Sequence, residues 1–151
     1  MSIDSSSVSD HFAFTLFQSF NKCQISVYYQ NTRGINSKLS DLHNSILCCN
    51  YDFICLSETW LNSSVTDSEF CPQNFHIVRS DRDFHKMNVS KGGGVLLAAQ
   101  HRFTVFKIDL SCRGFDSLQC TDVVCAKCSL GHFTIYIFVV YIQPIATVDE
   151  Y

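Results

Sequence analysis

Residues 24–58 set the architecture of the chain and read QISVYYQNTRGINSKLSDLHNSILCCNYDFICLSE. Residues 24–31 are rich in β-branched and aromatic side chains, which is typical of a strand, and Gly34 breaks that strand. Residues 52–58 predict a second strand, one that is buried. The apolar residues between the two strands recur at helical spacing and predict a helix over residues 36–50; they are Leu39, Leu42, Ile46 and Leu47.

A strand, a helix and a second strand in this order form a βαβ unit, in which the two strands lie parallel in one sheet. The carboxyl ends of parallel strands meet at one edge of the sheet, where α/β proteins bind their ligands. Asn31 ends the first of these strands and Glu58 ends the second. The sequence therefore predicts that these two side chains converge on one site.

The rest of the chain is rich in strand signals. Residues 75–80, 93–99, 103–108, 118–130 and 132–142 each have strand composition, with short polar connections between most of them. This pattern favours antiparallel strands, and Gly131 predicts a hairpin between the last two. Because only one amphipathic helix is predicted, we expect part of a sheet face to be exposed. Residues 1–24 are predicted to be irregular, and residues 25–151 to belong to one domain.

Length and composition support a single globular domain. The chain has 151 residues, of which 46% are hydrophobic and 17% are charged. The net charge of −3 is too small to indicate bulk attraction to polyanions or membranes. Residues 79–107 nevertheless carry a local excess of four positive charges, which predicts either a cationic patch or a set of separately solvated charges.

Nine cysteines without a secretory signal indicate a reducing, intracellular environment, nuclear or cytoplasmic, and not a secreted protein. Cys120, Cys125, Cys128 and His132 suggest zinc ligands at first sight. Side chains three apart on a strand point in opposite directions, however, so free thiols are the favoured interpretation. The most apolar run, residues 133–142, is far shorter than the roughly 20 residues of a membrane-spanning helix, so no membrane association is expected.

Four short stretches carry further information through their order. They are YYQNTRGI at 28–35, YDFICLSETWL at 51–61, the pair IVRSDRD and KGGGVLLA within 77–98, and VVYIQP at 139–144. Together they resemble the endonuclease/exonuclease/phosphatase superfamily. They are most similar to the apurinic-endonuclease-like domain that precedes the reverse transcriptase of non-LTR retrotransposons, especially jockey-like elements. The resemblance covers about residues 25–145.

This resemblance implies an α/β fold, the four-layered α/β sandwich of the DNase I-like type, here truncated at its C-terminal side. It also implies Mg²⁺-dependent, or Mn²⁺-dependent, hydrolysis of a phosphodiester, with DNA as the ancestral substrate. By resemblance, Glu58 is a metal ligand, Asn31 orients the metal shell or a phosphate oxygen, and Tyr141 reaches the scissile phosphate. Magnesium prefers oxygen ligands and keeps several waters, so one or two carboxylates suffice.

Each of these residues also has an ordinary structural interpretation. Glu58 is then a carboxylate at a strand end, Asn31 a turn residue beside Gly34, and Tyr141 an aromatic side chain of the core. Arg33 stands where repair enzymes of the superfamily carry an acidic residue, as is common in the retrotransposon branch. The order of the four stretches favours the family interpretation.

Two later motifs of the family, Asp-x-Asn and a closing Ser-Asp-His, are expected to be absent from this chain. These motifs supply acid/base groups, so we expect a truncated endonuclease domain with little or no turnover. One alternative is a non-catalytic nucleic-acid-binding remnant that uses the basic segment. Another is a phosphatase-like protein acting on a phosphorylated small molecule or lipid.

Overall fold

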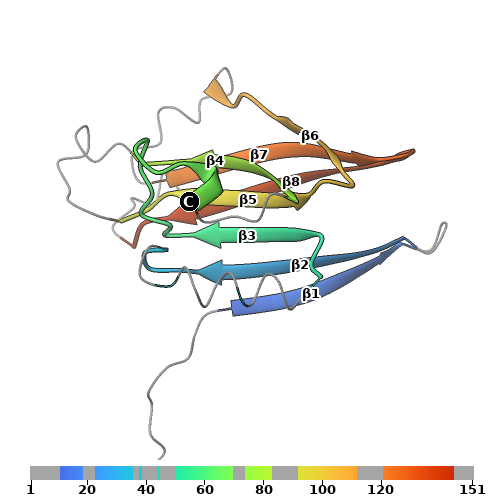
Figure 1. The fold of residues 1–151 in the computed structure, drawn as a ribbon, viewed down its shortest axis with the longest axis horizontal. Helices are drawn as coiled ribbons and strands as arrows, with labels where there is room; N and C mark the ends of the chain where they lie inside the picture. The colour runs from blue at the N-terminus through green and yellow to red at the C-terminus, as the bar shows by residue number, and fades with distance from the viewer. Residues whose placement is uncertain are drawn as a thin grey trace, which may run out of the picture.

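The structure, a computed structural model, describes residues 11–18, 23–35, 38, 44, 50–69, 74–82, 92–111 and 121–144. These residues form two β-sheets (Figure 1). Sheet A has the strand order β1-β2-β3-β5-β4, and sheet B has the order β6-β7-β8. The elements are β1 (His11–Gln18), β2 (Cys23–Asn31), β3 (Phe53–Ser57), the 3-10 helix η2 (Asp67–Glu69), β4 (Phe75–Ser80), β5 (Val95–Gln100), β6 (Thr104–Lys107), β7 (Thr121–Leu130) and β8 (Phe133–Ile142).

The parallel pair predicted from residues 24–58 is confirmed. β2 and β3 are parallel, and their register pairs Asn31 with Ser57, the residue before Glu58. Both strands therefore end at the same edge of sheet A. The strands that follow residue 58 pair antiparallel, as predicted, including the β7–β8 hairpin that turns at Gly131. The helix predicted at 36–50 lies almost entirely outside the described residues.

β1 corrects the prediction of an irregular segment over residues 1–24. The strand His11–Gln18 pairs antiparallel with β2 along its whole length, from His11 opposite Gln30 to Gln18 opposite Cys23. The local sequence explains the pairing, because Phe12, Phe14 and Leu16 recur at the period of two that a strand requires. The serine-rich residues that precede this strand suggested an irregular segment, so the alternation was not interpreted as a strand.

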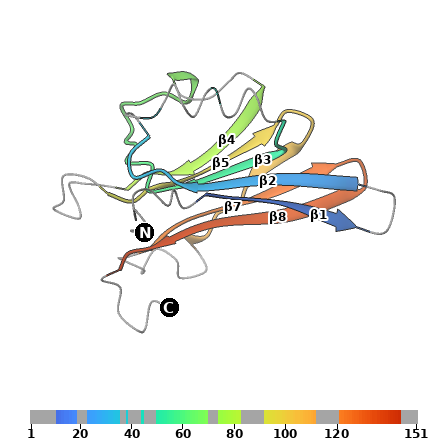
Figure 2. The same ribbon diagram turned by 90° about the horizontal axis from the view of Figure 1, so that it is seen from below.

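The two sheets stack face to face around the main hydrophobic core. Seen from below, β7 and β8 form a layer beneath β2, β3 and β5 (Figure 2). The inner faces of both sheets contribute fully buried side chains, among them Phe53, Leu97 and Val124. β3 and β5 lie in the middle of sheet A and are covered on both sides, which explains why residues 53–57 and 95–99 are all buried.

A second apolar cluster covers the other side of sheet A. It includes Ile54, Leu56 and Leu96 from the strands, with Ile35 and Leu61 from the connections. The segment 58–69, drawn in green, lies on this side in Figure 2. The connections that follow β2 and β3 are therefore packed in place by their own apolar residues.

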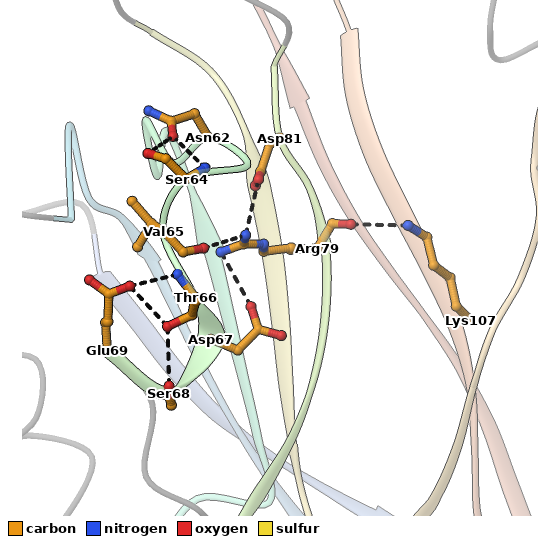
Figure 3. Close-up of polar contacts among 10 residues, drawn as sticks. All are labelled: Asn62, Ser64, Val65, Thr66, Asp67, Ser68, Glu69, Arg79, Asp81 and Lys107. Carbon is orange, nitrogen blue, oxygen red and sulfur yellow. Dashed lines mark hydrogen bonds and ion pairs between the residues drawn. The ribbon is translucent and has the colours of Figure 1, made fainter.

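Arg79 fastens the segment 62–69 to β4 (Figure 3). Its Nη2 donates to the carbonyl oxygen of Val65 at 2.7 Å, and its Nη1 lies 3.2 Å from Oδ1 of Asp67. Asp81 forms a second ion pair with the same guanidinium at 3.4 Å. Within the segment, Glu69 accepts from the backbone and the side chain of Thr66 at 2.8 and 2.9 Å, which closes the turn before η2.

The outer face of sheet B is apolar and exposed, as the single predicted helix led us to expect. Phe106, Tyr136, Phe138 and Val140 are 58%, 57%, 55% and 45% exposed. Cys128 lies in the inter-sheet core and Cys125, also buried, is not part of it, as predicted for residues three apart on a strand. Within the described part of the chain, no helix has both the length and the apolar character needed to cross a bilayer.

Candidate functional site

Glu58 and Tyr141 meet at the edge of sheet A where β2 and β3 end. The hydroxyl of Tyr141 donates to Oε1 of Glu58 at 2.5 Å, across a separation of 83 residues. Glu58 is only partly buried, and among the described residues none donates a hydrogen bond to its Oε2. This carboxylate is therefore held on one side and open to a ligand on the other.

Tyr141 is a partly buried core aromatic whose hydroxyl points to Glu58. Its ring, on the inner face of β8, packs against the inter-sheet core, whereas its hydroxyl reaches Glu58. Burial, together with the hydrogen bond to Glu58, raises the pKa of Tyr141 to about 12. At neutral pH the hydroxyl is therefore protonated and acts as a hydrogen-bond donor.

Asn31 lies beside Glu58 through strand pairing. Its Oδ1 accepts from the backbone N–H of Arg33 at 3.2 Å, which is an Asx turn. The next residue, Thr32, ties the two strand ends together, because its hydroxyl reaches the carbonyl oxygens of Ser57 at 3.1 Å and Glu58 at 2.9 Å. Within the described residues, the Asn31 side chain has no hydrogen bond to Glu58 or Tyr141, so the structure brings these two together and leaves Asn31 adjacent.

Unusual backbone conformations gather at this edge. Among the described residues, the non-glycine residues with positive φ are Arg33 at 47°, Glu58 at 51° and Trp60 at 54°. Such conformations cost roughly 1–3 kcal/mol each and are concentrated at functional sites. Gly34 allows the close packing here, since a Cβ atom on it would lie 2.7 Å from Cε3 of Trp60. The connections after β2 and β3 are therefore strained and tightly interlocked.

The glycine-rich stretch joins the same edge. Gly93 and Gly94 accept backbone hydrogen bonds from Trp60 at 3.0 Å and Thr59 at 3.2 Å. Arg82, at the other end of the same connection, pairs with Asp122 on β7, and Asp122 lies opposite Tyr141 in the β7–β8 register. All four stretches that carry the family resemblance are thus in mutual contact.

Asp122 was not predicted from the sequence. It stands in an ordinary strand pattern, and its ion-pair partner Arg82 is 40 residues away, so no local spacing marks it. Gln143 belongs to the stretch VVYIQP but was assigned no role. The signal that identifies these residues is contact with Tyr141 and Arg82, which only the structure provides.

His11 was also missed, and the strand register brings its backbone to this edge. β1 begins at His11, opposite Gln30 and therefore next to Asn31 across the β1–β2 pair. The expected absence of a Ser-Asp-His triplet is wrong, because Ser9, Asp10 and His11 have these residue types in this order. The triplet stands at the start of the chain and not after the fourth stretch, where the family carries it.

The basic segment 79–107 is largely neutralised where the structure describes it. Three of its arginines form ion pairs with aspartates. Arg79 pairs with Asp67 and Asp81. Arg82 pairs with Asp122, and Arg102 pairs with Asp52. Lys107 donates to the backbone carbonyl of Arg79 at 3.0 Å (Figure 3). Lys86 and Lys91 lie outside the described residues. The described arginines of segment 79–107 are therefore poorly available for phosphate groups.

The ligand chemistry at the edge suits a hard cation. Glu58 offers a carboxylate oxygen and Asn31 an amide oxygen, the ligand types that Mg²⁺ prefers. The described residues hold no group of three or more histidine, cysteine or acidic side chains arranged around a common metal position. Cys125 and Cys128 are buried free thiols with raised pKa values, and Cys120 lies outside the described residues. An oxygen site with few protein ligands thus fits better than a zinc site.

Comparison with protein-family models gives no match for this chain, and a search of curated proteins gives no significant match.

Proposed function

We propose that the chain carries the metal-binding part of a Mg²⁺-dependent phosphodiester hydrolase, derived from the endonuclease domain of a non-LTR retrotransposon, with DNA as the ancestral substrate. The hydrogen bond between Tyr141 and Glu58 is the observation that supports this most directly. It joins the second and fourth of the resembling stretches, and its two partners are the residues expected to contact metal and phosphate. A chance contact between a core residue and a surface residue would not be expected to join two of the resembling stretches through two of the expected site residues.

The proposed fold is the four-layered α/β sandwich of the endonuclease/exonuclease/phosphatase superfamily. Sheets A and B would be its two inner layers, since they stack through one hydrophobic core. The helix predicted at 36–50 would belong to an outer layer, over the apolar cluster that includes Ile35 and Leu61.

In the proposed site, Glu58 and Asn31 hold the cation through oxygen atoms. Bound Mg²⁺ stabilises the negative charge that develops on phosphoryl oxygens during hydrolysis. Tyr141 holds Glu58 by donating a hydrogen bond to its Oε1, and Oε2 then binds the cation. The strained conformation of Glu58, with a φ of 51°, sets the position of this carboxylate relative to the strand ends.

We expect turnover to be weak. General acid/base catalysis contributes a factor of roughly 10² to 10⁴, or about 3–5 kcal/mol, and the roles proposed for Glu58, Asn31 and Tyr141 do not include proton transfer. Metal binding is therefore the primary property to measure, and nicking of DNA the secondary one.

The test measures Mn²⁺ binding by electron paramagnetic resonance and Mg²⁺-dependent nicking of supercoiled plasmid. Glu58→Gln is compared with Glu69→Gln, which removes the same charge from an exposed carboxylate of the segment 62–69. We expect Glu58→Gln to lose metal binding and nicking, and Glu69→Gln to keep both. Equal metal binding by Glu58→Gln and the unaltered chain would contradict the proposal.

A parallel screen for phosphate release separates the phosphatase alternative. Hydrolysis of phosphorylated small molecules without any nicking would favour that class of substrate. The nucleic-acid-binding alternative receives less support, because binding through Arg79, Arg82 or Arg102 would require an ion pair to break.

A further inference from the structure

Arg82 is buried and has carboxylate and amide partners on both sides. It is 8% exposed, and its Nε donates to Oδ1 of Asp122 at 3.2 Å while its Nη2 contacts Oδ2. Oδ2 also accepts from the backbone N–H of Gly94 at 3.0 Å. A guanidinium with two parallel contacts to one carboxylate has a defined orientation, which a single contact would not give.

Gln143 occupies the other side of the guanidinium. With its amide oriented so that both of its polar atoms are satisfied, its oxygen accepts from Nη1 and Nη2 of Arg82 at 2.5 and 3.0 Å. Gly93 covers the group further, since a Cβ atom on it would lie 2.2 Å from Cζ of Arg82. Each of the three guanidinium nitrogens of Arg82 thus has a partner, and these contacts fix its position.

These partners surround Tyr141. Asp122 is its register partner on β7, Gln143 follows it by two residues on the same chain segment, and Cζ of Arg82 lies 5.9 Å from the centre of its ring. The cation therefore contacts the ring and its neighbours on two sides. Tyr141 itself makes the short hydrogen bond to Glu58.

We propose that Arg82 and Asp122 are positioning residues, which hold Tyr141 so that its hydroxyl stays on Glu58. Arg82 then acts through Tyr141 and does not contact phosphate. Replacing a buried ion pair by apolar residues often leaves stability unchanged or raises it. A contribution to stability therefore does not explain why Arg82 and Asp122 are paired here. Its role in turnover rests on the proposed function, whereas the positioning of Tyr141 does not.

The first arm of the test observes Tyr141 directly. Tyrosine ring carbons are labelled with ¹³C in the full chain, and the Tyr141 signal is assigned with Tyr141→Phe. We expect Arg82→Met and Asp122→Asn to shift and broaden this signal. Arg102→Met removes an arginine–aspartate pair of the same chemistry at the opposite end of β3, and we expect it to leave the Tyr141 signal unchanged.

Each variant is checked for a cooperative thermal transition. If Arg82→Met fails to fold, Asp122→Asn and Gln143→Leu test the same contact more mildly. An unchanged Tyr141 signal in the folded variants would overturn the proposal, whatever their activity.

The second arm measures nicking in variants that fold. Displacing a group of the site by about 1 Å costs up to roughly 100-fold in turnover, so we expect Arg82→Met to lower kcat by 10-fold to 100-fold with little change in KM. A raised KM with unchanged kcat would identify Arg82 as a phosphate contact and overturn the proposal. Absence of both Mn²⁺ binding and nicking in the unaltered chain would count against the proposed function only, and the labelled signal would then decide the positioning role.

Discussion

Gly93 lies directly against the guanidinium of Arg82, with room for no side chain between them. A Cβ atom on Gly93 would lie 2.2 Å from Cζ of Arg82, well inside van der Waals contact. The glycine and the arginine are therefore one structural unit, in which the absence of a side chain on the first permits the burial of the second. The role of this glycine is steric as well as conformational.

Gly93→Ala should destabilise the fold more than Gly92→Ala does. Both glycines have positive φ, 71° and 115°, but a Cβ on Gly92 meets nothing within 4 Å. A φ of 71° lies nearer than 115° to the left-handed region that alanine can adopt, so backbone strain alone predicts the smaller loss in Gly93→Ala. A larger loss in Gly93→Ala therefore reports the steric clash with Arg82, which we expect to cost about 1–3 kcal/mol. Urea unfolding measures both variants, and a smaller loss in Gly93→Ala would contradict the clash.

Glu58→Gly should be more stable than Glu58→Ala. Both variants lose the carboxylate and its hydrogen bond with Tyr141. The backbone at this position is left-handed, with a φ of 51°, and only alanine has a Cβ atom that is strained in that conformation. In an ordinary strand, glycine is less stable than alanine by roughly 0.5–1 kcal/mol, and here we expect the order to reverse. Thermal unfolding of the two variants tests this. Alanine more stable than glycine would mean that the local backbone relaxes.

Asp52→Ala should cost several times more stability than Asp67→Ala. Asp52 is 5% exposed and accepts from the backbone and the side chain of Ser26 at 2.9 and 3.1 Å, in addition to its pair with Arg102. Arg102 is 43% exposed and can turn to solvent, so the loss comes mainly from the Ser26 donors left without an acceptor, about 1–3 kcal/mol each. Asp67 is half exposed, and exposed ion pairs contribute about 0–1 kcal/mol. Chemical denaturation of both variants is the measurement. A similar loss in both would exclude burial as the cause.

Cys55 and Cys128 should resist alkylation in the native chain. Burial raises the pKa of Cys55 from 9.0 to about 12 and that of Cys128 to about 11, so almost none of the reactive thiolate exists at pH 8. Iodoacetamide labelling followed by peptide mass spectrometry should show both thiols modified at least 100-fold faster in urea. Since the folded pKa values lie above the unfolded one, their contribution to stability is complete below pH 9 and falls as pH rises toward 11–12. Rapid labelling without urea would contradict the burial of these side chains.

His11→Ala should reduce whatever nicking the chain shows. The register of β1 brings the backbone of His11 next to Asn31, and imidazole exchanges protons near neutral pH. Loss of a general acid or base costs a factor of roughly 10² to 10⁴ in rate. His132→Ala, in the exposed β7–β8 turn, is the control. Unchanged nicking by His11→Ala, together with unchanged Mn²⁺ binding, would remove His11 from the site.

Local patterns in the sequence predicted much of the fold. β3, β5 and the β7–β8 hairpin follow from buried apolar runs and from Gly131, because these signals lie within a few residues of one another. The proximity of Asn31 to Glu58 follows from the βαβ rule, since parallel strands end together. β1 was missed because its alternation of apolar residues follows a serine-rich run that suggested an irregular segment.

Long-range pairing could not be predicted in the same way. Arg82 and Asp122 are 40 residues apart, and Tyr141 and Glu58 are 83 apart. Which aspartate meets which arginine depends on how the two sheets stack, and no spacing rule encodes that stacking. The excess of positive charge in residues 79–107 was therefore visible in the sequence, whereas its pairing with aspartates outside and inside that segment was not.

The strand that carries Tyr141 limits how the protein can be made more soluble. In the described part of the chain β8 pairs on one side only, with β7, and long apolar edge strands promote aggregation. Charged substitutions are tolerable at the alternate, outward residues of β8, which include the large apolar residues Tyr136, Phe138 and Val140. The intervening residues pack in the inter-sheet core with Tyr141, so a shift of β8 by one residue would expose that core and carry the hydroxyl away from Glu58. The residues that can be changed to raise solubility thus lie on one face of β8, and the residues that keep the site intact lie on the other.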